Sequence, residues 1–472
     1  MSLDVALQDA ISGLRATQTQ IQVLSGNIAN AQTPGYSRQT ISQTTVALPT
    51  GGAGVQTSVI QRVADQLLSA NLTAQTTSAS AASTRDTYMQ QLQSLLGQVG
   101  SNNSISDSLN TFNNAMQAVA ATPEDPVAQS AAVNAGQLLA EQLNNLSSGI
   151  QNLRSTVDSD IGTSVTTLNN ALQTIGSLNS AISNLSAQNQ PIASLQDQRD
   201  QALAQISQML AVSSYTRPDG SVVVISKAGQ SLVDGSNVAQ FGYTQSGTVS
   251  AGSTLSPVTL NGTDVTSSLT TGKLGALLQL RNTDMPGLTA QLNQFTNNLY
   301  AQTSDVNLNT TNSGTNATND AHHFFGNVNI AGGVDNAATI EVNPSLVQTP
   351  DLLHTASGGP DPTISANIAQ NLSNTATFAA AGGFTGSMTT TLNNYAALII
   401  GQTATNAAQA TQNSTYQTQL QNQIQSQLSS ETGVNLDQEL SNLATYQNAY
   451  GASARVISTI QTMYDALMNI AS

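Results

Sequence analysis

Residues 7–39, LQDAISGLRATQTQIQVLSGNIANAQTPGYSRQ, decide how the rest of the chain is interpreted, because they join an amphipathic helix to a sharp stop. Apolar residues recur at alternating intervals of three and four, which places them on one narrow face of a helix. The stripe consists of Leu7, Ala10, Leu14, Thr17, Ile21, Leu24, Ile28 and Ala31, with Thr17 as its polar member. Such a stripe predicts packing against a partner helix.

The end of this helix is also encoded locally. Pro34 disfavours helical backbone geometry at Thr33. The tetrapeptide Thr33-Pro34-Gly35-Tyr36 suits a type II turn, with Pro at the second position and Gly supplying the positive φ of the third. We therefore expect the helix to end near Ala31 and the chain to turn immediately afterwards.

The other end of the chain carries a second stripe with the same spacing. It consists of Leu436, Leu440, Leu443, Gln447, Tyr450, Ala454, Ile457, Gln461, Tyr464, Met468 and Ala471. Val456, Ile460, Met463, Leu467 and Ile470 widen the apolar face over the last turns, which indicates more than one neighbour. We expect the two terminal helices to form a coiled coil and the rest of the chain to be a large insertion between them.

A single pair of such helices is weakly stabilised. Burying the apolar side chains of the N-terminal stripe yields less free energy than the loss of conformational entropy costs when residues 7–31 become ordered. We therefore expect both ends to be disordered or frayed in an isolated subunit, and to become ordered when neighbouring subunits cover them.

Composition excludes several classes of protein. Charged residues make up 8% of the chain, compared with about 25% in ordinary soluble domains. The net charge of -15, with Lys227 and Lys273 as the lysines, argues against nucleic acid as a partner. The absence of cysteine excludes disulfides, thiolate metal sites and cysteine nucleophiles.

Targeting signals are also missing from the sequence. No apolar run reaches the roughly 18 residues that a membrane span needs. The N-terminus has no basic region before an apolar one, and it carries Asp4 and Asp9, so it does not read as a secretory signal peptide. If the protein leaves the cell, we expect a route that needs no such signal.

The middle of the chain is mainly helical in pattern. Helical periodicity covers 59–99, 104–121, 126–188, 192–210, 269–306, 364–372 and 389–428. Short β-type runs between 212 and 265 are separated by the turn sequences Pro218-Asp219-Gly220, Asp234-Gly235 and Asn261-Gly262. The polar segment 307–320 is expected to be a surface loop, and 339–342 a short strand.

These patterns predict a mainly α protein with a small β domain. Its parts are terminal coiled-coil helices, an elongated helical bundle and an inserted β domain. We expect an inner assembly domain of residues 1–55 and 430–472, a helical bundle of 56–211 and 268–429, and the β domain in 212–267.

Several motifs resemble those of bacterial flagellar axial proteins, the family of rod, hook and hook-associated proteins. The N-terminal signature is Gly26-Asn27-Ile28-Ala29-Asn30 followed by residues 33–39, TPGYSRQ. The C-terminal motif runs from Gly433 through Asn435-Leu436-Asp437 to 446–450 and 452–457. The sequence around 195–203, LQDQRDQAL, the segment 218–224 and the pair Phe324-Phe325 also match. The resemblance spans nearly the whole chain.

The resemblance implies a structural subunit of a ring-like homo-oligomer at the junction of hook and filament. It also implies three partners, namely the hook protein, hook-associated protein 3 and an export chaperone that holds the C-terminal helix. The expected location is extracellular, in the flagellum, after type III export without a cleaved signal peptide. A hook or rod axial protein, or a secreted helical adhesin or phage-tail-like protein, is the alternative.

We expect assembly to depend on residues at both ends. The N-terminal set is Leu7, Leu14, Ile21, Leu24, Asn27, Ile28, Asn30, Pro34, Gly35 and Tyr36. The C-terminal set is Asn435, Leu436, Asp437, Leu440, Leu443, Tyr446, Tyr450, Ile457, Tyr464 and Leu467.

We predict no enzyme activity, cofactor or metal. His322 and His323, with Asp320 and Asp335 nearby, lack the spacing of a helical metal-binding pair. Asp197, Arg199 and Asp200 are interpreted as a structural salt bridge or cap rather than an acid-base cluster. Phe324 and Phe325 are expected to pin a loop to the bundle.

Overall fold

The computed structural model describes residues 3–47, 53–98, 100, 103–247, 249–311, 321–330 and 335–471. The chain forms two compact units. Unit 1 comprises Met1–Ala79, Thr166–Phe241 and Gln417–Ser472, and unit 2 comprises Ser80–Val165 and Gly242–Tyr416. Three long helices, α2 (Gln66–Leu96), α4 (Pro126–Ala187) and α11 (Leu392–Thr432), contribute residues to both units. The protein is mainly α with small β-sheets, as predicted, and the three-part domain division stays a prediction.

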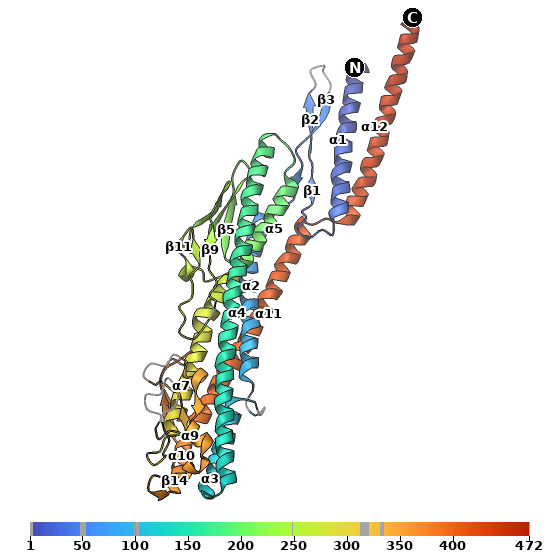
Figure 1. Cartoon of the computed structure of the whole chain (residues 1–472). Coiled ribbons are helices and arrows are strands. Elements are labelled where there is room, and N and C mark those ends of the chain that lie inside the picture. Colours follow the sequence, from blue (N-terminus) through green and yellow to red (C-terminus); the bar gives the residue numbers. More distant parts are fainter. Residues whose placement is uncertain are drawn as a thin grey trace. The chain divides into compact units, whose positions relative to one another are not determined.

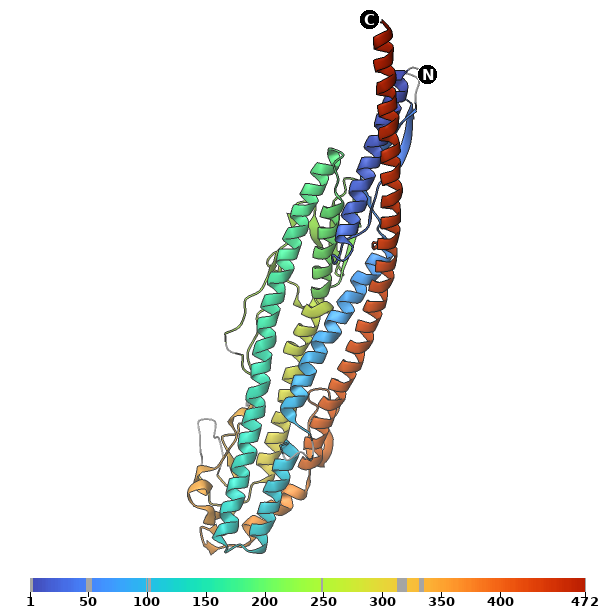
Figure 2. The same cartoon turned by 90° about the vertical axis from the view of Figure 1, so that its right-hand side faces the viewer.

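Unit 1 contains both ends of the chain. Helices α1 (Leu3–Asn30) and α12 (Leu436–Ala471) lie side by side in both views (Figures 1 and 2). On its other side α1 contacts a hairpin formed by β2 (Gln43–Ala47) and β3 (Ala53–Thr57). Residues 48–52, between these two strands, lie outside the described residues. Helix α5 (Ala193–Met209) completes the helical part of this unit.

The helix expected from Val59 begins later, at Gln66. Residues 61–62 instead form strand β4 (Gln61–Arg62), which pairs antiparallel with β1 (Gln39–Thr40). Pairing with β1 gives the backbone N–H and C=O groups of residues 61–62 hydrogen-bond partners, so they need no helix there, although the apolar periodicity predicted one. Asp65 then starts α2, because its carboxylate accepts a hydrogen bond from the Leu68 backbone N–H at 2.9 Å.

The β-region of unit 1 is a four-stranded antiparallel sheet in the order β5-β6-β7-β8. Its strands are β5 (Val212–Thr216), β6 (Val222–Ser226), β7 (Ser231–Asp234) and β8 (Asn237–Val238). Asn179 of α4 anchors the sheet, because its amide both donates to and accepts from the backbone of Val222, at 2.8 and 2.9 Å. The turns occur where Pro218-Asp219-Gly220 and Asp234-Gly235 predicted them, with Gly220 and Gly235 at positive φ.

Unit 2 is built on the first part of α4. The leucine and isoleucine stripe of α4 is buried at Leu139, Leu143, Leu146, Ile150 and Ile161. Helix α3 (Ile105–Ala121) begins with a capping box between Ser104 and Asp107, the pattern that favours a helix start. Phe324 and Phe325 are buried against Phe112 of α3, with ring centroids 4.9 and 5.5 Å away, so they pin their segment to the helices as expected.

The predicted helix 269–306 is interrupted. It consists of α6 (Gly272–Gln279), the π-helical segment η2 (Leu280–Asp284) and α7 (Met285–Gln302). Pro286 lacks a backbone N–H and its ring conflicts with the carbonyl four residues earlier. The wider π turn directly before it removes this conflict without ending the helix.

The remaining elements are short, apart from α10. They are β9 (Phe241–Gly242), β10 (Thr259–Leu260), β11 (Thr263–Asp264), η1 (Thr266–Ser268), β12 (Phe325–Gly326), α8 (Asn336–Thr339), β13 (Glu341–Val342), α9 (Pro344–Gln348), η3 (Pro350–Leu353), β14 (Thr355–Ala356), β15 (Gly359–Pro360), α10 (Thr363–Ser373), β16 (Thr375–Phe378) and β17 (Met388–Thr391). The strand predicted at 339–342 is shorter than expected, because Thr339 ends α8 and β13 covers Glu341–Val342. Most of the loop predicted at 307–320 lies outside the described residues.

Candidate assembly site at the terminal helices

Helix α1 is only partly covered by its neighbours in a single chain. Its buried residues are Val5, Ala16, Thr17, Gln20, Val23, Leu24 and Asn27. Of the predicted stripe, Leu24 is buried, whereas Leu7, Leu14, Ile21 and Ile28 are half-buried. The apolar face of α1 therefore has room for another neighbour.

Helix α12 turns much of its apolar surface away from α1. Glu439 and Ile460 are the buried residues among the α12 side chains that the structure describes. We call the exposed apolar residues the α12 stripe: Leu436, Leu440, Tyr450, Val456, Met463, Leu467 and Met468. Leu440 and Leu467 are each 52% exposed. Leu443, Tyr446, Ile457 and Tyr464 are half-buried, and Asn435 and Asp437 are exposed.

The turn after α1 has the predicted type II geometry. The Tyr36 N–H donates to the Thr33 carbonyl at 3.2 Å, and Gly35 has a φ of 78°. Gln201 of α5 packs directly on this turn and donates to the Pro34 carbonyl at 3.2 Å. A Cβ at position 35 would lie 2.7 Å from the Gln201 Nε2 atom. Glycine is therefore favoured both by the backbone conformation and by the close approach of α5.

Asn27 is the centre of the hydrogen bonds that hold this turn. Its Nδ2 donates to the Gln39 carbonyl at 2.9 Å and to Glu439 Oε2 at 3.0 Å. Its Oδ1 accepts from the Gln39 N–H and from the Tyr36 hydroxyl, both at 2.9 Å. All four hydrogen-bonding positions of the amide are used, and the side chain is 1% exposed. The neighbouring Asn30 caps the end of α1 by donating to the Gly26 carbonyl at 2.9 Å.

Glu439 brings the C-terminal helix to the same point. It lies in the first turn of α12, is 3% exposed, and its second carboxylate oxygen is 3.9 Å from the Arg38 guanidinium. The Arg38 backbone N–H donates to the Thr432 carbonyl at 2.8 Å. Residues from α1, the turn, the end of α11 and α12 therefore meet in one polar cluster.

A second ionic cluster fixes the turn to α5. Arg62 Nη1 lies 3.2 Å from Asp197 and 2.5 Å from Asp200, and the Ser37 N–H donates to Asp197 at 3.4 Å. The prediction of structural ion pairing at Asp197 and Asp200 is confirmed, but their close partner is Arg62, which was not predicted. Arg199 Nη1 donates to the Gly220 carbonyl at 2.7 Å, which ties α5 to the β5–β6 turn.

Burial dominates the electrostatics of these clusters. Burial raises the pKa of the Asp197 carboxyl, although Ser37 and Arg62 act in the opposite direction. Burial, followed by the charges of Asp197 and Glu439, raises the pKa of the Tyr36 hydroxyl to about 12. The hydroxyl therefore stays protonated at neutral pH and can donate to Asn27.

Sequence reasoning missed three members of this site, namely Glu439, Arg38 and Arg62. The available signal was the scarcity of charge. In a chain with 8% charged residues, an Arg next to the turn and a Glu in the first turn of α12 are candidates for a specific ion pair. Periodicity directed attention to apolar positions, and so these residues were not singled out.

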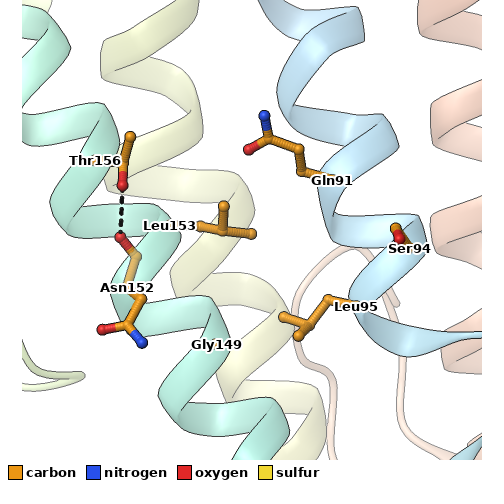
Figure 3. Close-up of a pocket in the computed structure, with 7 residues that line it drawn as sticks. All are labelled: Gln91, Ser94, Leu95, Gly149, Asn152, Leu153 and Thr156. Atoms are coloured by element: carbon orange, nitrogen blue, oxygen red, sulfur yellow. Dashed lines mark hydrogen bonds between the residues drawn. The ribbon is translucent and has the colours of Figure 1, made fainter.

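Unit 2 contains an open depression of about 510 Å³ between α2 and α4. Figure 3 shows the residues that line it, which are Gln91, Ser94, Leu95, Gly149, Asn152, Leu153 and Thr156. Its Thr156 hydroxyl donates to the Asn152 carbonyl of its own helix at 3.0 Å, so it is not aimed at a ligand. The depression carries no titratable group.

The two adjacent histidines, which the sequence does not favour as metal ligands, have other contacts. His323 stacks on Tyr300 with ring centroids 3.9 Å apart, and His322 Nδ1 is 2.8 Å from the Leu308 carbonyl. Asp320 lies outside the described residues. Within the described ranges, no three His, Cys, Asp or Glu residues are grouped as a metal site. In the same ranges, no helix combines the length and apolar character needed to cross a membrane.

Three family models match the chain in sequence order. Residues 7–36 match the model described as "Flagella basal body rod protein". Residues 89–322 match "Flagellar hook-associated protein FlgK helical domain", and residues 425–470 match "Flagellar basal body rod FlgEFG protein C-terminal". The first and last models cover the paired terminal helices and the start of the turn. The chain is therefore a structural component of the bacterial flagellum, of the rod, hook and hook-associated class.

Within this class, the similar proteins of known name are hook-associated proteins. Flagellar hook-associated protein 1 of Salmonella typhimurium is 24% identical, with 98% of this chain and 99% of the relative covered. The protein of the same name from Bacillus subtilis is 25% identical, with 98% of each chain covered. The one from Escherichia coli K12 is 27% identical over 59% of this chain and 52% of the relative. The chain is therefore similar, over nearly its whole length, to flagellar hook-associated protein 1.

A solved structure is also similar to part of the chain. It is described as the flagellar hook junction protein FlgK from Burkholderia pseudomallei, and it is 28% identical with a TM-score of 0.45. The match covers 52% of this chain and 44% of that chain, so it spans less than half of the solved structure.

Proposed function

We propose that this protein is the subunit that joins the flagellar hook to the filament, and that it assembles through its terminal helices into a ring-like homo-oligomer. The α12 stripe carries the proposal. Its seven exposed apolar residues lie along one long helix. Exposing them to water in a free monomer is unfavourable in free energy, and burying them at an interface between subunits is favourable. The half-buried residues of the α1 stripe supply a matching surface on a second copy.

The predicted site residues divide into two groups by their surroundings. The apolar members, from Leu7 to Ile28 and from Leu436 to Leu467, would contact neighbouring subunits. The polar and turn members, such as Asn27, Pro34, Gly35 and Tyr36, would fix the orientation of the terminal helices relative to α5. In this proposal residues 1–55 and 430–472 form the assembly domain, 56–211 and 268–429 the bundle, and 212–267 a β domain.

The proposed partners follow from the same role. They are further copies of this chain, the hook protein on one side and hook-associated protein 3 on the other. An export chaperone would cover α12 before secretion, since the stripe would otherwise be exposed in the cytoplasm. The protein would reach the outside of the cell by type III export without a cleaved signal peptide.

We also propose that the role is structural and not catalytic. Support comes from the fact that the buried polar groups of the site already have partners within the chain. Asp197 and Glu439 are each engaged by an arginine, and Asn27 has no hydrogen-bonding position left for a substrate.

A deletion strain tests the junction role. We expect bare hooks, with unassembled filament protein in the medium. Intact filaments combined with lost surface attachment would instead favour a secreted adhesin, and a missing hook would favour a rod or hook subunit.

Point variants test the interface. Leu440→Asp and Leu467→Asp place a charge in the α12 stripe and should abolish filament growth in the complemented strain while the protein is still exported. Asn448→Asp is the matched control, because it adds the same charge at an exposed position of α12 whose helical spacing from Leu440 and Leu467 places it on another face. Normal filaments with the two leucine variants, or equal loss with the control, would contradict assembly through the stripe.

A further inference from the structure

The two ends of the chain meet through a hydrogen bond between side chains that are 412 positions apart in sequence, Asn27 and Glu439. We propose that this contact couples the packing of α12 to the conformation of the turn 33–39. When α12 packs on α1, Glu439 accepts a hydrogen bond from Asn27 and so acts as a positioning residue for the turn. We call this contact the lock. The proposal concerns a single chain and does not depend on the hook-filament role.

The geometry explains why the turn would depend on α12. Three of the four hydrogen bonds of Asn27 go to the turn, to the Tyr36 hydroxyl and to both backbone groups of Gln39. The fourth goes to Glu439. If α12 leaves, the Nδ2 group exchanges a charged acceptor for water, so the arrangement loses a charge-assisted hydrogen bond.

The backbone provides a second link between the same segments. Arg38 donates its N–H to Thr432, at the end of α11, and accepts from the Val63 N–H at 2.8 Å. Its guanidinium faces Glu439. The turn is thus held from one side by α1, from another by β4, and from a third by the α11–α12 segment.

The orientation of the Asn27 amide makes the lock testable by charge. The Gln39 N–H can donate only to the oxygen, and so the NH₂ group must face Glu439 and the Gln39 carbonyl. Asn27→Asp keeps the shape but places a carboxylate oxygen 3.0 Å from Glu439. A like-charge contact at that distance in a buried site is strongly unfavourable. Adding Glu439→Gln removes the repulsion between the two carboxylates and returns a donor, while the Gln39 carbonyl still faces an acceptor at position 27.

The low content of basic residues gives a simple readout. The chain has 11 Lys and Arg residues, of which Arg217 precedes a proline that blocks trypsin, and one of the remaining sites is the Arg38–Gln39 bond inside the turn. Exchange of the Gln39 amide hydrogen reports on the same position, because that N–H donates to Asn27. Both can be measured on the purified full-length chain in dilute solution.

We expect Glu439→Ala and Asn27→Asp each to raise tryptic cleavage at Arg38 and exchange at Gln39 by about 10-fold or more, the size expected for a lost charge-assisted hydrogen bond. Asp437→Ala is the control, since it removes an exposed carboxylate from the same first turn of α12. It should change neither rate.

The combined variant is decisive. With the lock, Asn27→Asp together with Glu439→Gln should recover part of the protection that Asn27→Asp alone loses, namely the part due to repulsion between the two carboxylates. The proposal is overturned if the double variant is as labile as the single one, or if Asp437→Ala has the same effect as Glu439→Ala. It is also overturned if the unsubstituted chain is cut at Arg38 as fast as Glu439→Ala.

Discussion

Arg281 and Asp158 form a buried ion pair in unit 2, with 2.9 Å between Arg281 Nη1 and Asp158 Oδ1 and exposures of 1% and 0%. The Tyr243 hydroxyl donates to the same carboxylate, and the Ser246 N–H donates to its other oxygen at 2.8 Å. Arg281 also donates to the Ser256 carbonyl at 3.2 Å. The pair therefore holds the irregular segment after Gly242 on the helices, at the π turn where α6 meets α7.

Removing one partner of this pair should be costly. Asp158→Ala leaves the Arg281 charge buried without a counterion, and we expect it to lower the unfolding free energy of unit 2 by about 3–5 kcal/mol. Glu141→Ala, at an exposed position of the same helix, should have little effect. Urea unfolding followed by circular dichroism measures both. Equal midpoints for the two variants would show that the pair is not important for stability.

Two glycines of α4 should respond oppositely to alanine. A Cβ at Gly136 would lie 2.4 Å from the Phe324 ring, whereas a Cβ at Gly162 would lie 3.6 Å from Tyr243, an ordinary contact. We expect Gly136→Ala to destabilise by about 1–3 kcal/mol through overpacking. Gly162→Ala should stabilise by about 0.5–1 kcal/mol, because alanine favours the helix. Thermal unfolding of the two variants tests this, and a loss of stability in both would contradict it.

The Asp335 carboxyl should make unit 2 less stable as pH rises. Burial raises its pKa, although the Ser147 hydroxyl donates to it at 2.7 Å. A group whose pKa is higher in the folded than in the unfolded state contributes stability below its unfolded pKa, and that contribution is lost as pH rises through the folded value. Asp335→Asn removes this dependence. Its stability relative to the unsubstituted chain should therefore be greater at pH 7 than at pH 4, and urea midpoints that differ equally at both values would exclude the effect.

Hydrogen exchange should reveal a gradient along the terminal helices. The first turns of α1 and the last turns of α12 have few buried side chains apart from Val5 and Ile460. Backbone amides in these turns should therefore exchange rapidly in a dilute monomer. Amides near Asn27 should exchange more slowly, since the polar clusters hold that end. In assembled material both regions should be protected. Uniform strong protection in the monomer would contradict the expectation that neighbours complete the order of the ends.

Much of the fold could be predicted because its determinants are local. Pro34 and Gly35 specify their turn through allowed backbone angles, and the Asn261-Gly262 pair adopts φ values of 50° and 85°, as its turn sequence indicates. The three-four spacing of α4 predicted a helix from 126 to 188, and the structure has Pro126–Ala187. The start of α2 could not be predicted, because the pairing of Arg62 with Gln39 is a contact between distant segments.

The assembly site was predictable in part for the same reason. Spacing identified Leu440 and Leu467 as apolar stripe residues, but it did not reveal that pairing with α1 leaves both exposed. Asn27 belonged to a recognisable motif, whereas its partner Glu439 did not stand out, because no local rule relates the two.

By itself, the sequence determined the terminal helices, their stripes and the turn, since helix periodicity and turn sterics act over a few residues, and its motifs indicated the class of protein by resemblance. The tertiary structure alone decided which face of α12 is covered and which charges are paired. Those outcomes depend on how distant segments fit together, as the meeting of Asn27 with Glu439 and of Arg281 with Asp158 demonstrates.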